Sequence, residues 1–280
     1  MKMKSFEIFV VTVCSIATTT TAFLLHTKDD VMMKQSSHLW KVGKTIELGL
    51  SSSAAINPPL EREEIERILE EIPVYALSSK LSDSIVFINE GNKNIANFFL
   101  SKEIAENVAS SYGSSENVQV DSYSLGRIYF QFFDSSSSLD SDVQVLMNNE
   151  QEIEYRLIPD PREIEQAQTI LSQMMGGDGL SSQFFTAKYN DIPLFMDQRL
   201  RLSSPTTKEA ICPIYFAWND LMTTCQEYVG AYEQSQQGDY QAAISVSNLS
   251  QLVEQMKQPS AVDFGIVEFV PASPNPLEEE

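Results

Sequence analysis

One pattern occurs twice in this sequence, and this internal repeat constrains the fold more than any other feature. Residues 72–77 (IPVYAL) resemble residues 192–197 (IPLFMD), and each copy closes on an apolar stretch followed by Pro159 or Pro271. Between these points the apolar positions keep the same order in both copies. Self-similarity over this length predicts a chain built from two related halves.

Two further pairs of segments extend the repeat. The aromatic run at residues 98–104 (FFLSKEI) aligns with residues 215–221 (YFAWNDL), and in each copy it leads into a predicted helix. Residues 118–128 align in the same way with residues 242–252. Apolar residues alternate in some of these segments and follow the helical spacing in others. The sequence therefore predicts an α+β fold in which each half is a small, mainly antiparallel sheet packed with helices.

Start and stop residues place several of these elements. An amphipathic helix at the N-terminus of the repeated body is predicted between Pro58 and Pro73. Ser101 is expected to cap the helix of the first half and Asn219 that of the second half, while Pro161 opens a helix that connects the halves. The strands of the first half are expected at residues 74–77, 85–88, 95–100, 118–120, 143–147 and 154–158.

The chain begins with the features of a signal peptide. Lys2 and Lys4 precede a short apolar stretch, and small residues then end at Ala22, so cleavage between Ala22 and Phe23 is predicted. A membrane anchor is the alternative. The signal peptide is favoured because the apolar stretch is too short to span a bilayer comfortably.

Residues 23–56 form the second part of a leader. They are mildly basic and rich in hydroxyl groups, like a transit peptide, although Asp29 and Asp30 depart from that pattern. The two parts together resemble the leaders of algae whose plastids lie inside the secretory route, which implies a plastid destination. The expected organisation is a signal peptide at 1–22, a transit-peptide-like leader at 23–56, a first half at 57–175, a second half at 176–271 and a disordered acidic tail at 272–280.

The body of the protein is strongly acidic. The chain has 19 basic and 39 acidic residues, and residues 1–56 contribute six of the basic and four of the acidic ones. This leaves 13 basic and 35 acidic residues, a net charge near −22. Such a charge argues against binding to nucleic acid or to an anionic membrane face. It gives a well-hydrated surface, and it would attract basic segments of other proteins.

Residues for catalysis or for binding a metal are scarce. The chain has two histidines, His26 and His38, and both lie in the predicted leader. Neither a dinucleotide-binding nor a phosphate-binding glycine motif is present. Glu163 and Glu165 are the kind of paired acids that an enzyme uses, but they lie on the polar side of a predicted helix, where solvated charge is expected. We expect a protein that is not an enzyme and holds neither a cofactor nor a metal.

The cysteines leave two interpretations open. Cys14 lies in the predicted signal peptide, so Cys212 and Cys225 are the cysteines of the body. Cys212 falls on a predicted strand and Cys225 about two turns into the following helix, a placement that would allow a disulfide in an oxidising compartment. Two buried free thiols are the favoured alternative.

Asn248 also has two interpretations. Residues 248–250 (NLS) form a glycosylation sequon, which matters only if the chain passes through the endoplasmic reticulum. The favoured interpretation is that Asn248 caps the helix that carries Leu249, as Ser124 precedes Leu125 in the first half.

Several segments together resemble a known protein family. They are IPVYAL at 72–77, YRLIPD at 155–160, IPLF at 192–195 and PIYF at 213–216, which runs into NDL at 219–221. In order and spacing they are similar to the family of the twenty-two-kilodalton subunit of the translocon at the inner envelope of chloroplasts. The resemblance covers residues 60–271, with apparent insertions around Ser135 and at residues 234–239.

This resemblance implies both a fold and a role. The family consists of soluble, duplicated α+β proteins of the space between the plastid envelopes that take part in preprotein passage and behave like chaperones. The expected partners are therefore preproteins in transit and translocon components, with peripheral membrane association as an option. The resemblance supplies no catalytic residues. The alternative role is a structural or assembly subunit docked on a membrane complex of the plastid.

Overall fold

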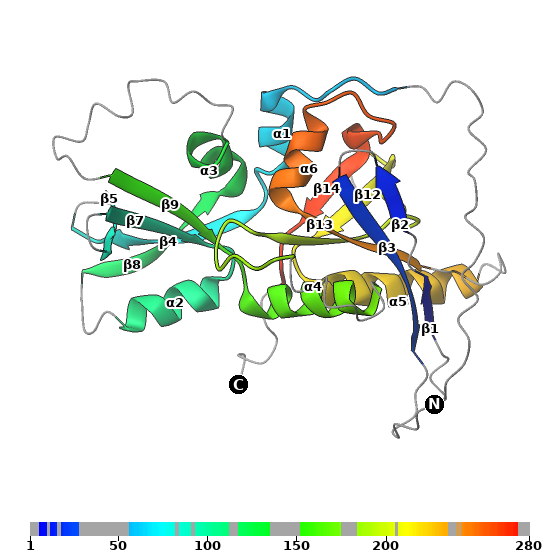
Figure 1. Cartoon of the computed structure of the whole chain (residues 1–280), viewed down its shortest axis with the longest axis horizontal. Helices are drawn as coiled ribbons and strands as arrows, with labels where there is room; N and C mark the ends of the chain where they lie inside the picture. Colours follow the sequence, from blue (N-terminus) through cyan, green and yellow to red (C-terminus); the bar gives the residue numbers. More distant parts are fainter. Residues whose placement is uncertain are drawn as a thin grey trace.

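The structure is a computed structural model of the whole chain, and its described part contains two sheets and six helices (Figure 1). The α+β class expected from the sequence is confirmed. The backbone alone is described for β1 (Phe6–Phe9), β2 (Thr12–Ser15), β3 (Thr18–Thr27), Glu152 and residues 231–234. Side chains are described for residues 56–81, 84–90, 93–111, 117–134, 153–174, 184–204, 207–230, 240 and 242–273.

The elements follow the same order in both halves. The first half contains α1 (Arg62–Ile68), β4 (Pro73–Ser79), β5 (Ser84–Ile85), β6 (Ile88–Glu90), β7 (Lys93–Phe99), α2 (Lys102–Ser111), β8 (Val118–Ser124), α3 (Leu125–Phe132) and β9 (Glu152–Ile158). Helix α4 (Pro161–Met174) then leads into the second half. That half contains β10 (Pro193–Asp197), β11 (Leu202–Ser203), β12 (Ala210–Tyr215), α5 (Trp218–Gln234), β13 (Ala242–Asn248), α6 (Leu249–Met256), the 3₁₀ helix η3 (Phe264–Ile266) and β14 (Val267–Val270).

The two sheets also share their strand pairings. In the first sheet the order is β9, β7, β4, β8; β4 runs antiparallel to β7 and β8, and β9 runs parallel to β7. The second sheet has the order β14, β12, β10, β13, with the same directions at each pairing. The short strands β5, β6 and β11 pair with β4, β7 and β12. Beyond β13, the second sheet continues into β1, β3 and β2.

The register of the strands corrects one detail of the sequence repeat. Tyr75 pairs with Phe99 in the first sheet, and its counterpart Phe195 pairs with Tyr215 in the second. Phe99 therefore corresponds to Tyr215, so the alignment of 98–104 with 215–221 is wrong by one residue. Each run contains two adjacent aromatic residues, and similarity alone does not distinguish them. The register does, because a shift of one residue exchanges the two faces of a strand.

Local signals place some helix starts correctly and miss another. The side chain of Ser101 accepts a hydrogen bond from the backbone N–H of Ile104 at 3.4 Å, and Pro161 is the first residue of α4, as predicted. The predicted capping role of Asn219 is wrong, because α5 begins one residue earlier, at Trp218. The helix after Pro58 begins later than predicted, at Arg62.

One predicted strand is wrong because the chain changes partner within it. Residues 85–88 divide between β5, which pairs with β4, and β6, which pairs with β7. The chain thus crosses from one strand to another at residues 86–87, which interrupts a regular ladder. The predicted strand at 143–147, the boundary of the halves at 175–176 and most of the tail, at 274–280, lie outside the described residues.

The largest apolar cluster joins the two halves, and it lies under the helices on the upper side of the sheets (α1, α3 and α6 in Figure 1). Helices α1, α3 and α6 cover this face, and α1 packs against both α3 and β14. Ile65 of α1 and Leu69, which directly follows the helix, are fully buried in the cluster, together with Phe98 from the first sheet and Leu194 from the second. Because one cluster contains side chains from both sheets, burying it requires both halves to be folded.

A glycine allows α1 and α3 to pack closely. A Cβ atom at Gly126, in α3, would lie 2.2 Å from the backbone oxygen of Glu66 in α1. Such a contact cannot form without moving one of the two helices. Gly230 in α5 offers a natural comparison, because a Cβ atom there would meet nothing within 4 Å.

We expect Gly126→Ala to destabilise the protein by about 1–3 kcal/mol, because an added methyl group overpacks the contact between the helices. Gly230→Ala should be neutral or stabilise by up to about 1 kcal/mol, since alanine favours an exposed helical position. Urea unfolding followed by circular dichroism measures both free energies. Equal stability of the two variants would contradict the close packing at Gly126.

Candidate functional site

The lower face of the first sheet carries an apolar cluster that is only partly covered. Leu77, Phe99 and Ala105 form its buried centre. Half-buried apolar residues surround them: Tyr75, Val86, Ile104, Val108, Ala109, Val118, Val120 and Ile158. We call these eleven residues the open cluster. Of the helices, α2 packs on this face, with contacts to β4, β7 and β8 (Figure 1).

The corresponding face of the second sheet is closed. Two helices, α4 and α5, pack beneath it and contribute Ala167, Ile170 and Leu221 to its core (Figure 1). Val120 pairs with Leu77 in the first sheet, just as Ile244 pairs with Asp197 in the second. Yet Ile244 is fully buried and Val120 is not. Two features bury Ile244: it also pairs with Phe23 of β3, whereas β8 pairs only with β4 among the described strands, and two helices pack beneath its sheet.

A half-covered apolar face has a chemical use. Burial of apolar surface is favourable and non-directional, so such a face binds apolar side chains of a partner without reading a particular sequence. Two more apolar side chains are exposed at the β4–β5–β6 end of the same half: Leu81 is 80% exposed and Phe87 is 38% exposed. The first half therefore offers more accessible apolar surface than its folding requires.

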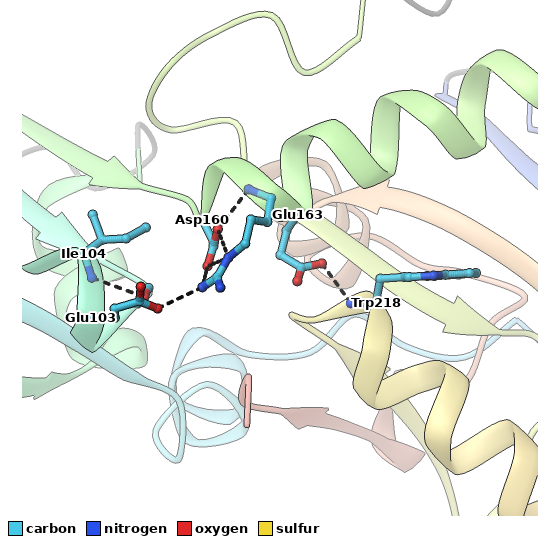
Figure 2. Close-up of polar contacts among 7 residues, drawn as sticks. Glu103, Ile104, Asp160, Glu163 and Trp218 are labelled. Carbon is cyan, nitrogen blue, oxygen red and sulfur yellow. Dashed lines mark hydrogen bonds and ion pairs between the residues drawn. The ribbon is translucent and has the colours of Figure 1, made fainter. Parts of the chain in front are cut away.

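A polar junction lies where the halves meet, at the N-terminal ends of α2 and α4 (Figure 2). Asp160 accepts a hydrogen bond from the backbone N–H of Arg162 at 2.9 Å and so caps α4. The guanidinium of Arg162 donates to Asp160 at 2.7 Å and to Glu103, in the first turn of α2, at 3.1 Å. Both carboxylates raise the pKa of Arg162, chiefly through the hydrogen bond to Asp160. This arginine thereby ties the two helices together.

Glu163 connects α4 to α5 at the same junction (Figure 2). Its side chain accepts a hydrogen bond from the backbone N–H of Trp218, the first residue of α5, at 2.8 Å. Burial raises the pKa of Glu163 to about 7. The sequence predicted a solvated carboxylate here, and that prediction is wrong because α5 packs over it. Glu165 is exposed, as predicted.

The two cysteines of the body are free thiols on different sides of the second sheet. Cys225 is fully buried in the cluster under α4 and α5, whereas Cys212 is half-buried against the large upper cluster. Burial raises the pKa of both thiols. The disulfide considered from the sequence has no support in this arrangement, which separates the side chains by the sheet.

A buried carboxylate organises the polar groups around Cys225. Asp197 accepts hydrogen bonds from the Tyr240 hydroxyl at 2.7 Å and from the backbone N–H groups of Ala243 at 2.8 Å and Arg199 at 2.9 Å. The Cys225 thiol lies 3.8 Å from the same carboxylate oxygen that accepts the hydrogen bond from Tyr240. With these donors in place the carboxylate fixes the end of β10 against the start of β13, which is a structural role.

Asn248 has a structural role as well. Its side-chain oxygen accepts a hydrogen bond from the backbone N–H of Ser250 at 2.9 Å, and its amide donates to Asp191. The predicted helix cap is confirmed. Ser124 precedes α3 as Asn248 precedes α6, but its side chain makes no capping hydrogen bond. Its hydroxyl is buried without a hydrogen-bond partner in the described structure.

The remaining expectations from the sequence concern metal ligands, membrane spans and the leader. Within the described residues, no three His, Cys, Asp or Glu side chains gather as metal ligands would. None of the helices described combines the length and apolar character that a membrane crossing requires. Ala22, Phe23 and His26 lie in β3, whose backbone alone is described, and His38 lies outside the described residues. Cleavage after Ala22 stays a prediction.

Comparisons with known proteins identify related sequences and structures. The model of the Tic22-like family matches residues 13–275. Tic22 from Plasmodium falciparum has a similar structure, with a TM-score of 0.54 and 21% identity over 74% of this chain and 91% of that chain. Anabaena Tic22, described as a protein of protein transport, has a TM-score of 0.54 and 17% identity over 76% of this chain and 93% of that chain. None of the curated proteins matches.

The sequence missed the roles of Glu163 and Arg162. The segment Asp160-Pro161-Arg162-Glu163 has the residues of a local helix cap, and Asp160 acts as one. The sequence contained one weak signal. Ala217 precedes α5 as Ser101 precedes α2, and alanine has no side-chain oxygen to cap a helix, so an acceptor from elsewhere, such as Glu163, was to be expected. That signal requires the corrected register, which the structure supplied.

We expect both body thiols to be titratable in the unfolded, unreduced protein, in a chain carrying Cys14→Ser. In the folded protein Cys212 should react with a thiol reagent much faster than Cys225, since Cys225 is buried and its pKa is raised. Reaction with Ellman's reagent before and after unfolding measures this. Two thiols missing from the unfolded sample until a reductant is added would demonstrate a disulfide instead.

Proposed function

Because the chain belongs to the Tic22-like family, we propose that it is a plastid import factor that holds preproteins in transit in the space between the envelopes, without catalysing a reaction. Membership in this family implies a role related to protein import. The plastid destination rests on the two-part leader with Ala22 and Phe23 at its cleavage site, and the location between the envelopes rests on the resemblance to the family. The holding activity rests on the open cluster.

The open cluster carries the proposal because it is accessible apolar surface in a defined place. Its half-buried rim, formed by residues such as Tyr75, Val108 and Val120, would be covered further by a partner's apolar side chains. Each methylene group removed from water contributes about 0.8 kcal/mol. A few such contacts give the weak, reversible binding that a factor acting on many different preproteins requires.

The charge of the body supports the same proposal. Its net charge is near −22, while transit segments are basic and rich in hydroxyl groups. Opposite charges speed the encounter, and burial against the open cluster then holds the segment. Salt screens the first effect far more than the second. Binding should therefore weaken, but not vanish, as the salt concentration rises.

We further propose that the two halves arose by duplication of one unit. The identical strand order and directions of the two sheets support this origin, as do the helices that follow equivalent strands. On this view the open cluster is what remains when one copy is covered by a single helix. In the second copy two helices, α4 and α5, cover the equivalent face, which there forms part of the core.

Isothermal titration with a basic transit peptide tests the binding function. The double substitution Val108→Ser with Val118→Ser should weaken binding by about tenfold, since two half-buried side chains lose apolar contact worth about 0.7 kcal/mol each. Raising the salt concentration should weaken binding of both proteins. Val262→Ser is the matched control, because Val262 is 55% exposed and lies outside the open cluster.

The outcome separates the proposed role from its alternative. Absence of peptide binding, or equal binding by the double variant with its circular dichroism unchanged, would remove the open cluster as the holding site. One stable stoichiometric partner recovered with the intact protein, in place of many transient ones, would indicate an assembly subunit.

A further inference from the structure

Helix α5 depends on a residue from another helix for its cap. In the first half, α2 begins after Ser101, whose hydroxyl accepts a hydrogen bond from the backbone N–H of Ile104. The corresponding residue before α5 is Ala217, which has no side-chain acceptor. Glu163 replaces it from α4, at 2.8 Å from the backbone nitrogen of Trp218 (Figure 2). Unlike a serine hydroxyl, this cap is a carboxyl group that titrates.

Every element packed around Glu163 contributes a charge. Asp160 lies in the turn before α4, Arg162 on α4 itself and Asp220 in the first turn of α5. Beyond Arg162, Glu103 of α2 accepts a hydrogen bond from the same guanidinium. The N–H of Trp218 and Arg162 lower the pKa of Glu163, whereas Asp160 and Asp220 raise it.

Burial decides the balance between these effects. Removal of water from the carboxyl group is the largest of them and raises its pKa to about 7, from an ordinary value of 4.5. The group therefore changes charge in the neutral range, where an ordinary glutamate stays ionised.

We propose that Glu163 is a pH-sensitive latch that joins α4 to the first turn of α5 and governs how firmly these two helices cover the second sheet. The covered side chains include Leu221 and Cys225 of α5, both fully buried. Release of the first turn of α5 would expose Leu221, which lies in that turn, as the rim of the open cluster is exposed in the first half.

The direction of the effect follows from the raised pKa. The folded protein binds the proton more tightly than the unfolded chain does, so the latch stabilises most below pH 4.5, the ordinary pKa. This stabilisation is lost as the pH rises from there to about 7. Above that value an ionised carboxylate is held in a partly buried place beside Asp160 and Asp220. The start of α5 should then open more readily than under acidic conditions.

Trp218 is a built-in reporter of the latch. Its backbone nitrogen donates to Glu163, and its ring packs edge-on against Phe195 with centroids 5.7 Å apart. The chain has two tryptophans, and the other is Trp40 in the predicted leader. In the full chain carrying Trp40→Phe, all tryptophan emission therefore comes from the first residue of α5.

The experiment follows this emission as the pH is raised from 4 to 8. We expect a shift to longer wavelength between pH 4.5 and about 7, the range over which the stabilisation is lost, because opening exposes the ring to water. Glu163→Gln should abolish the transition and keep the emission seen at low pH, since glutamine mimics the protonated acid. Glu165→Gln is the matched control on the exposed side of α4 and should leave the transition unchanged.

Two neighbouring substitutions test the direction of the effect. Arg162→Gln should move the midpoint to higher pH, because it removes the positive charge that lowers the pKa of Glu163. Asp220→Asn should move it to lower pH. A flat response in the starting protein, or a transition that persists in Glu163→Gln, would overturn the proposal. The proposal would also fail if Arg162→Gln and Asp220→Asn moved the midpoint in the same direction.

Discussion

The structure depends on a single apolar cluster that both sheets share. Helix α1 packs against α3 and against the strand β14 of the other half, and its Ile65, together with Leu69 just after the helix, is buried among side chains from both sheets. Neither half could bury this face alone, because each would leave the other's apolar residues in water. The close approach of α1 to α3 at Gly126 is part of the same constraint. The two halves therefore share one apolar core.

Below the sheets the two halves differ, and this difference gives the molecule its candidate binding surface. Two helices close the lower face of the second sheet, whereas α2 covers that of the first (Figure 1). Val120 and Ile244 pair with equivalent residues of β4 and β10 but differ in exposure, and the pairing of β13 with β3 contributes to this difference. The connecting helix α4 adds to the asymmetry, because it packs against β10 and β13 of the second sheet.

The helix caps show how local and tertiary interactions substitute for one another. The side chains of Ser101 and Asn248 accept hydrogen bonds from backbone N–H groups in the first turns of α2 and α6, and each residue directly precedes the helix that it caps. At α5 the local acceptor is absent, and Glu163 reaches across from α4. A local serine hydroxyl stays neutral, whereas a carboxyl group delivered into a partly buried place acquires a shifted pKa. Tertiary capping thus makes the cover of the second sheet sensitive to its surroundings.

The sequence by itself determined the α+β class and several of the local elements. The two copies of the Ile-Pro strand, the caps Ser101 and Asn248 and the start of α4 at Pro161 all follow from nearest-neighbour preferences, which act within a few residues. Tertiary structure alone decided the match of Phe99 to Tyr215, the division of residues 85–88 between two strands and the burial of Glu163. These depend on which face packs against which partner, and residues far apart in the sequence supply that partner.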